Sequence, residues 1–99
     1  MSDYNSKLKS ESMDYLCDAI LTLENRDECY RFFEDIFTIN EIKTIEQRLQ
    51  VAKMLKEKKT YTDIASITGA STATISRVNR CINYGADGYN IILDRLNKK

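Results

Sequence analysis

The sequence of 99 residues contains no histidine and no proline, and only three glycines and three cysteines. Without histidine the usual zinc sites are excluded, and Cys17, Cys29 and Cys81 lack the C-x-x-C spacing of a metal or redox motif. We therefore expect buried, reduced thiols. The absence of proline, together with abundant Leu, Ile, Lys and Glu, predicts an all-α fold, because no side chain breaks a helix or removes an amide donor.

Other features are missing as well. No apolar run approaches the roughly 20 residues that a membrane span needs, and the N-terminal residues MSDYNSKLKS lack the apolar stretch of a signal peptide. A cytoplasmic protein that does not contact a membrane is expected. The chain also has no glycine-rich phosphate loop and no G-x-S-x-G motif. With histidine absent too, the sequence argues against an enzyme, and it predicts no metal ion and no cofactor.

The charges are unevenly distributed although they sum to zero. Residues 1–47 carry five Lys and Arg against eleven Asp and Glu, a net charge of −6, whereas residues 48–99 carry ten against four, a net charge of +6. The basic half suits a polyanion, and a solvated basic face without a ligand is the alternative. The length predicts a single domain over residues 1–99, because a second domain would have too little chain for its own core.

Apolar spacing predicts about six helices. The first runs from about Lys7 to Glu24, the second lies within residues 25–38, and the third runs from about Asn40 to Lys58. Gly85 and Gly88 predict a helix stop and a loop before the final helix. The second helix has apolar side chains on most of its circumference, which indicates a subunit interface. The expected inner stripe of the third helix is Ile42, Ile45, Leu49, Ala52 and Leu55.

Two of these helices have alternative start points in the sequence. Either Asn25 or Asp27 can cap the second helix, and either Thr38 or Asn40 can cap the third. Each of these side chains can accept a hydrogen bond from a free amide of the first turn.

The stretch YTDIASITGASTATISRVNR, residues 61–80, has helical spacing on both sides of Gly69. Glycine adopts positive φ without steric cost, so it can end one short helix and turn the chain into the next, which Ser71 or Thr72 then caps. The positions where two crossing helices share a core hold apolar or small residues, namely Ile64, Ala65, Ile75 and Val78. The pattern predicts a helix-turn-helix, and a helical hairpin without DNA function is the alternative.

The second helix of this pair has the residues of a DNA reader. Short side chains let a helix lie deep in the major groove and contact base edges or thymine methyl groups. Arg77 and Arg80 lie one turn apart and can reach phosphates or a guanine. The short side chains are Ser71, Thr72, Ala73, Thr74 and Ser76. Phosphate contacts are further expected from Lys56, Lys58 and Lys59 and from Thr60 or Thr62.

Two longer stretches, FTINEIKTIEQRLQVAKML and TYTDIASITGASTATISRVNR, resemble the Trp repressor family over about half of the chain. TGASTATISR is the most specific piece, and the segments FTINEI, GASTATISR and NYG are similar to the YerC/YecD type of Gram-positive bacteria. The resemblance implies an intertwined all-helical homodimer, in which the first, second and last helices interlock. Such a dimer reads a palindromic operator in double-stranded DNA.

In that family two arginines and a threonine hold the amino acid that acts as corepressor, and the resemblance places Arg48, Arg77 and Thr38 at those positions. The family glycine that makes room for the indole is Val78 here. Relieving the overlap of the valine with a ring costs about 1 to 3 kcal/mol. L-tryptophan is therefore not expected as the effector, and another small molecule or none stays open.

Together these features predict a DNA-binding transcriptional regulator, with repression as its expected action. The alternative is a helical, dimeric protein-interaction module that retains the helix-turn-helix only as structure.

Overall fold

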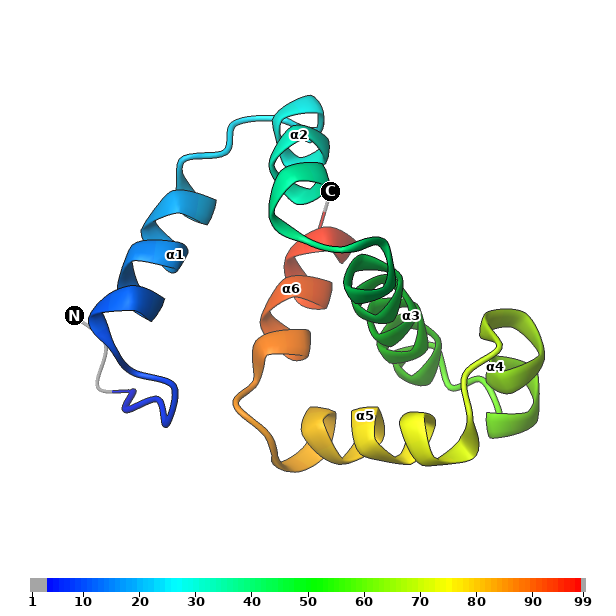
Figure 1. The fold of residues 1–99 in the computed structure, drawn as a ribbon. Coiled ribbons are helices and arrows are strands. Elements are labelled where there is room, and N and C mark those ends of the chain that lie inside the picture. Colours follow the sequence, from blue (N-terminus) through cyan, green and yellow to red (C-terminus); the bar gives the residue numbers. More distant parts are fainter. Residues whose placement is uncertain (1–3, 99) are drawn as a thin grey trace. The chain divides into compact units, whose positions relative to one another are not determined.

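The computed structural model describes residues 4–98, which form six helices and no strand (Figure 1). They are α1 (Glu11–Leu21), α2 (Arg26–Ile36), α3 (Ile39–Lys56), α4 (Tyr61–Thr68), α5 (Thr72–Tyr84) and α6 (Gly88–Asn97). The prediction of an all-α fold with about six helices is confirmed. The chain divides into two compact units, Met1–Phe37 and Thr38–Lys99, called here the N-terminal and C-terminal units. The single domain expected over residues 1–99 stays a prediction.

The first helix of the N-terminal unit is shorter than its apolar spacing indicates. Ser10 Oγ accepts a hydrogen bond from Met13 N at 3.0 Å and thereby starts α1 at Glu11. Before it, Leu8 N donates to Ser6 Oγ, which holds this stretch in a turn. The predicted start at Lys7 is wrong because serine side chains compete with the helix for backbone amides. The predicted end at Glu24 is wrong as well: α1 stops at Leu21, and Thr22 caps it, with its Oγ1 donating to Ala19 O.

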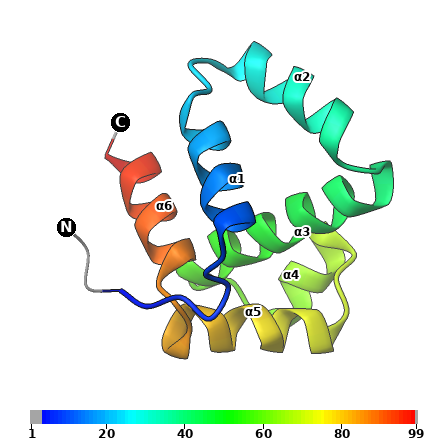
Figure 2. The same ribbon diagram turned by 60° about the vertical axis from the view of Figure 1, so that its left-hand side comes forward.

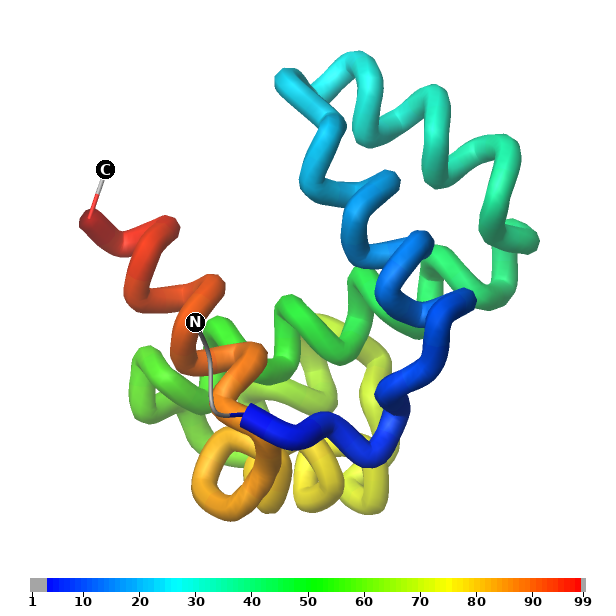
Figure 3. Tube along the Cα trace, turned by 90° about the vertical axis from the view of Figure 1, so that its left-hand side faces the viewer, coloured from blue at the N-terminus to red at the C-terminus, as the bar shows by residue number. Residues whose placement is uncertain are grey.

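The second helix of this unit begins at an asparagine cap. Asn25 Oδ1 accepts from Glu28 N at 2.9 Å, which decides between the two candidate caps. The rings of Phe33 and Phe37 meet edge to face with centroids 5.7 Å apart. No residue of α1 or α2 is buried, so the apolar surface that the sequence indicates lies open in both helices, which Figure 3 shows joined by a short link.

The C-terminal unit holds the buried core. α3 is its central helix and packs against α4, α5 and α6 (Figures 1 and 2). The buried residues come from all four helices and from the turn after α4: Val51, Ala52, Met54, Ile64, Ala70, Ile75, Val78 and Leu93. The predicted inner stripe of α3 is only partly right, because Ile45 and Leu49 are 43% and 38% exposed while Val51 and Met54 are buried.

The ends of the helices in the C-terminal unit differ from the sequence limits by a few residues. Thr38 caps α3, and its side chain and that of Glu41 each accept from the other's backbone amide. α3 ends at Lys56 instead of Lys58, because Lys58 takes a left-handed backbone conformation. α5 ends at Tyr84, directly before Gly85, where the sequence predicts a helix stop.

The two glycines near the C-terminus were predicted to form a helix stop and a loop before the final helix. Gly85 does end α5, and a Cβ at this position would lie 2.5 Å from the carbonyl oxygen of Cys81. Only glycine fits there without movement of the backbone. Gly88 is the first residue of α6, so the prediction that it belongs to the loop is wrong.

The cysteines are free, but the expectation that they are buried is wrong. Cys17 and Cys81 are exposed, and Cys29 is half-buried. Cys17 lies on α1, which buries none of its residues. No group of His, Cys, Asp and Glu in residues 4–98 is arranged to hold a metal ion. None of the helices described combines the length and the apolar character that crossing a membrane requires.

Candidate nucleic-acid interface

The turn between α4 and α5 has the geometry that the lone glycine predicts. Gly69 has φ +75° and ψ +5°, and its amide donates to Ala65 O at 2.9 Å, so α4 stops there. Thr68 Oγ1 donates to Ile64 O and accepts from Ala70 N, which satisfies the next amide of the turn. The turn of the helix-turn-helix therefore consists of three residues, Gly69 to Ser71, and local hydrogen bonds fix its backbone.

Packing against α3 holds the same turn in place. Gln47 of α3 donates through Nε2 to Thr68 O at 3.2 Å. Ala70 is 5% exposed, and Ile64 and Ile75 on either side of the turn are fully buried. The two helices thus share the core residues that their spacing predicts, and the turn presents α5 at a fixed angle to α4.

The start of α5 is closed by a serine cap. Ser71 Oγ accepts from Thr74 N at 3.1 Å and donates to Thr74 Oγ1 at 3.1 Å. Ser71, and not Thr72, is therefore the cap. Two of the predicted base-contacting residues, Ser71 and Thr74, thus hydrogen-bond each other at the N-terminus of the helix.

The side of α5 that faces away from the core follows from the helical rotation of about 100° per residue. Ile75 and Val78 are buried and Ile82 is half-buried, so these residues mark the inner side. The residues nearest the opposite side, called here the outward face of α5, are Ala73, Ser76, Arg77, Arg80 and Tyr84, all of them exposed. Thr72 lies beside this face and is exposed as well. Four of the ten predicted DNA-contacting residues thus lie on the outward face with Thr72 beside it, whereas Ser71 and Thr74 do not, and Thr74 is half-buried.

Tyr84 is a member of the outward face that the sequence analysis missed. Its side chain is 87% exposed, the largest exposed fraction among the large hydrophobic residues of the described chain. It follows Arg80 by four residues and Arg77 by seven, so helical spacing would place it on the same face. The sequence analysis considered DNA contacts only as far as Arg80, so this residue was overlooked.

The cations around the helix-turn-helix are free of acidic partners. Within residues 4–98 the ion pairs join Lys9 to Asp14, Arg31 to Asp27 and Lys53 to Glu57. Arg77 and Arg80 form none of these pairs, and neither do Lys58 and Lys59. The segment from Lys56 to Tyr84 carries five Lys and Arg against Glu57 and Asp63, a net charge of +3. This part of the surface therefore has a positive charge available to an anionic partner.

The first helix of the pair, α4, begins with polar residues. Thr60 caps α4, with its Oγ1 accepting from Asp63 N at 3.1 Å. Thr62 lies in the first turn and is exposed, as are Lys58 and Lys59 just before the helix. These predicted phosphate contacts therefore lie on accessible surface.

The residues predicted for an effector pocket are only partly assembled. Thr38 uses its hydroxyl to cap α3, and Val78 is 2% exposed and belongs to the hydrophobic core. Arg48 and Arg77 are both exposed. Their common neighbour is Tyr89 of α6, a half-buried residue that packs against the core and that the sequence analysis assigned no role.

The pKa of the Tyr89 phenol depends on its burial and on the charges around it. Burial raises its pKa above the usual value, Cys81 raises it further, and Arg48 and Arg77 lower it. The charges of the two predicted effector arginines therefore both act on the same phenol of α6.

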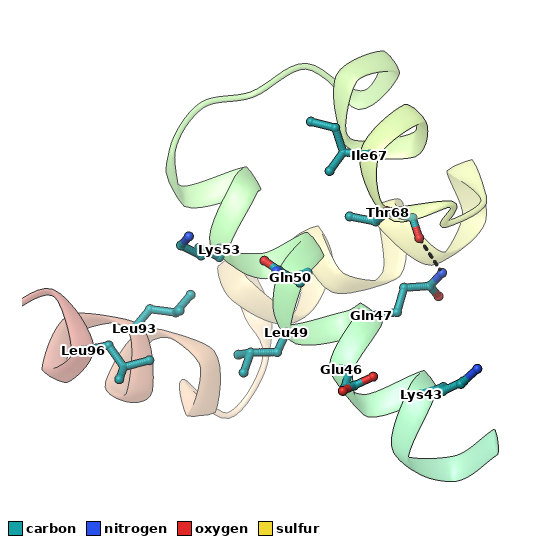
Figure 4. A pocket seen from close by; sticks show the side chains of 10 residues that line it. All are labelled: Lys43, Glu46, Gln47, Leu49, Gln50, Lys53, Ile67, Thr68, Leu93 and Leu96. Carbon is teal, nitrogen blue, oxygen red and sulfur yellow. Dashed lines mark hydrogen bonds between the residues drawn. The ribbon is translucent and has the colours of Figure 1, made fainter. Parts of the chain in front are cut away.

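A second feature of the C-terminal unit is an open groove of about 770 Å³ between α3, α4 and α6 (Figure 4). Its apolar side chains are Leu49, Ile67, Leu93 and Leu96, and its polar lining is Lys43, Glu46, Gln47, Gln50, Lys53 and Thr68. Ile67 is 71% exposed and Leu96 is 52% exposed. The groove therefore leaves apolar surface uncovered in this unit too.

Comparison with known proteins gives consistent matches. The sequence matches the family described as Trp repressor protein over residues 11–97. The uncharacterised protein YerC of Bacillus subtilis (strain 168) is 57% identical over 90 residues, which cover 91% of this chain and 86% of YerC.

Two crystal structures are similar along most of their length. A protein of Staphylococcus aureus proposed to be a Trp repressor matches with a TM-score of 0.88 at 58% identity, over 94% of this chain and 93% of that chain. A TrpR-like protein of Eubacterium eligens ATCC 27750 matches with a TM-score of 0.89 at 59% identity, over 94% and 96% of the two chains.

Proposed function

Because the chain belongs to the Trp repressor family, we propose that it is a transcriptional regulator that binds double-stranded DNA through its helix-turn-helix. This family consists of DNA-binding regulators and not of enzymes. The observation that carries the proposal is the outward face of α5, where small side chains and two cations without acidic partners in residues 4–98 lie together.

The proposed contacts follow from the chemistry of this face. Ala73 and Ser76 have short side chains, so α5 can enter the major groove until its backbone lies close to the base edges. Thr72 offers a hydroxyl and a methyl group beside them. Arg77 and Arg80 extend further and bind phosphates or a guanine, and each phosphate that they neutralise steepens the salt dependence of binding by about 0.9 in the log–log slope.

The protein is further proposed to act as a homodimer. None of residues 4–37 is buried, and Leu21 and Tyr15 are 80% and 78% exposed. Exposed apolar surface of this extent is unfavourable in water and is covered by a second copy of the chain. A twofold dimer carries two copies of α5, so it prefers a palindromic operator.

The effector and the site of action are proposals of the same kind. We infer a cytoplasmic repressor whose operator binding does not depend on L-tryptophan. Val78 is part of the core, and Tyr89 is already the aromatic neighbour of Arg48 and Arg77. A valine at position 78, where the family glycine makes room for the indole, opposes binding of that ring, because relieving the overlap costs about 1 to 3 kcal/mol.

Selection of bound fragments from random duplex DNA at two salt concentrations tests the proposal, since it reports binding, specificity and palindromy together. Arg77→Ala and Thr72→Ala are expected to weaken binding to the selected sequence. Arg95→Ala removes the same charge from α6 and serves as the matched control. If both α5 variants bind as tightly as the parent, the assignment of α5 to base reading is wrong.

The alternative function is a dimeric protein-interaction module. The open acidic and apolar surface of α1 and α2 favours it. In that case the Arg77→Ala and Thr72→Ala variants keep full partner binding, and no DNA sequence is enriched in the selection. Enrichment of a palindrome that both variants lose excludes this alternative as the main function.

A further inference from the structure

The end of α3 has a hydrogen-bond pattern that is normally completed by glycine. Lys59 N donates to Met54 O at 3.1 Å and Lys58 N donates to Leu55 O at 3.0 Å. These two bonds form a Schellman motif, and the residue in its left-handed position is Lys58, with φ +67°. Glycine takes this conformation without steric cost, whereas a lysine does not. The backbone conformation alone would therefore favour glycine over lysine at position 58.

The Lys58 side chain lines a small cleft. The cleft has a volume of about 280 Å³ and lies between the end of α3 and the second half of α5. Its lining residues, which define the lysine cleft below, are Leu55, Lys56, Lys58, Asn79, Ile82 and Asn83. The lining thus consists of two lysine side chains, two side-chain amides and two aliphatic side chains.

Hydrogen bonds hold several of these groups in place. Lys56 Nζ donates to Asn90 Oδ1 at 2.9 Å, and Asn90 Nδ2 donates to Ile82 O at 3.0 Å. On α5, Asn83 Nδ2 donates to Asn79 O at 3.0 Å. The Lys56 ammonium has three donors, of which this network uses one. Donors therefore remain for a ligand in the cleft.

The charge of the cleft is not neutralised by the adjacent carboxylate. Glu57 lies between the two lysines in sequence, but its Oε2 is 3.8 Å from Lys53 Nζ, on the previous turn. Neither Lys56 nor Lys58 forms an ion pair with any residue from 4 to 98. The lysine cleft therefore combines two ammonium groups that form no ion pair within residues 4–98 with side-chain amides that can donate hydrogen bonds, which is chemistry that can recognise a phosphate.

We propose that the lysine cleft binds a phosphate group, and that this group belongs to the DNA backbone next to the groove that α5 enters. The inference rests on the proposed function and adds a specific contact to it. Thr72, Ser76, Asn79 and Asn83 follow one another along one side of α5 at helical spacing. This row leads from the edge of the outward face into the cleft, so a strand that borders the major groove can place a phosphate there. A free phosphate-bearing molecule has the same chemistry and is the other source.

The test uses a substitution for which stability and binding are expected to change in opposite directions. Lys58→Gly relieves the left-handed lysine and is expected to leave the full-length protein at least as resistant to urea as the parent. DNA binding is expected to weaken equally for all sequences, with the salt slope reduced by about 0.9. Lys58→Asn, a residue that tolerates the same conformation, removes the charge without adding chain flexibility. Lys98→Gly removes a lysine from another helix end and is the matched control.

A titration of the DNA-free protein with inorganic phosphate separates the two sources. If the amide signals of Asn79 and Asn83 shift with phosphate in the parent and not in Lys58→Gly, while DNA binding is equal in both, the ligand is a free phosphate. If neither DNA binding nor the phosphate titration differs between the two proteins, the proposed site is wrong. A parent protein that binds no DNA contradicts the proposed function, and the titration still tests the cleft.

Discussion

The two units of this chain are built from amphipathic helices that are used in different ways. In the C-terminal unit the apolar sides of α3 to α6 meet, and Val51, Ile64 and Ile75 are fully buried. In the N-terminal unit α1 and α2 have comparable apolar residues, yet no residue is buried. The comparison shows that an apolar stripe indicates that a helix must be covered, but not whether the cover comes from the same chain.

The units also differ in charge. Residues 1–37 carry four Lys and Arg against nine Asp and Glu, a net charge of −5, and residues 38–99 carry eleven against six, a net charge of +5. A DNA duplex repels the first and attracts the second. The unit with its own core thus has the charge for DNA, and the unit without one suits protein contacts.

The largest expected effect is the loss of a core side chain in the C-terminal unit. Ile75→Ala removes a fully buried group that joins α5 to α3, and we expect it to lower the free energy of unfolding by about 2 to 5 kcal/mol. Urea unfolding measures the change. Ile36→Ala, at a position that is 47% exposed, is the matched substitution in α2. If Ile75→Ala and Ile36→Ala lowered the free energy of unfolding equally at high dilution, the two units would not differ in how they bury apolar side chains.

A smaller effect, dependent on protein concentration, is expected from the N-terminal unit. Leu21 is 80% exposed in the single chain, and if a second copy covers it, Leu21→Ala weakens the dimer by about 1.5 to 3 kcal/mol per subunit. Sedimentation over a dilution series measures the dissociation constant. Ser12→Ala changes an exposed polar residue of the same helix and should leave the constant as in the parent. A parent that stays monomeric at every concentration would contradict the dimer.

The sequence predicted the helix-turn-helix in detail because its signals are local. The positive φ of Gly69, the cap before α5 and the burial of Ile64, Ile75 and Val78 all follow from residues within one short segment. Local chemistry of this kind does not depend on how distant helices pack. Most residues of the outward face of α5 were predicted for the same reason.

The parts that were missed depend on contacts between distant segments. α3 has apolar residues around much of its circumference, so periodicity alone did not select Val51 and Met54 over Ile45 and Leu49. The place of Tyr89 near Arg48 and Arg77 depends on how α6 packs on the rest of the unit. The left-handed Lys58 was missed because its sequence offers no glycine or asparagine to mark such a turn.

In the C-terminal unit, substitutions of Gly69 in the turn between α4 and α5 are expected to have an effect of intermediate size. Gly69→Ala forces an alanine to φ +75°, but a Cβ there meets no atom within 4 Å, so only the backbone conformation opposes it. We expect a loss of about 1 kcal/mol in the free energy of unfolding, with a smaller loss for Gly69→Asn, because asparagine tolerates this region better. Thermal unfolding of both variants measures the difference. Equal stability of Gly69→Ala and the parent would contradict the left-handed turn.

The smallest expected effect concerns the pKa of Tyr89. Burial raises this pKa, so above about pH 10 the folded chain keeps a proton that the unfolded chain loses. The folded state then binds more protons, and the free energy of unfolding falls as the pH rises through the raised pKa. Tyr89→Phe has no phenol to titrate, so its stability should decline less than that of the parent between pH 9.5 and pH 11, roughly the range on either side of the usual tyrosine pKa. Urea unfolding across this range measures both slopes. Parallel slopes would mean that Tyr89 is as well solvated in the folded chain as in the unfolded one, and the core of the C-terminal unit would then not extend to α6 at this residue.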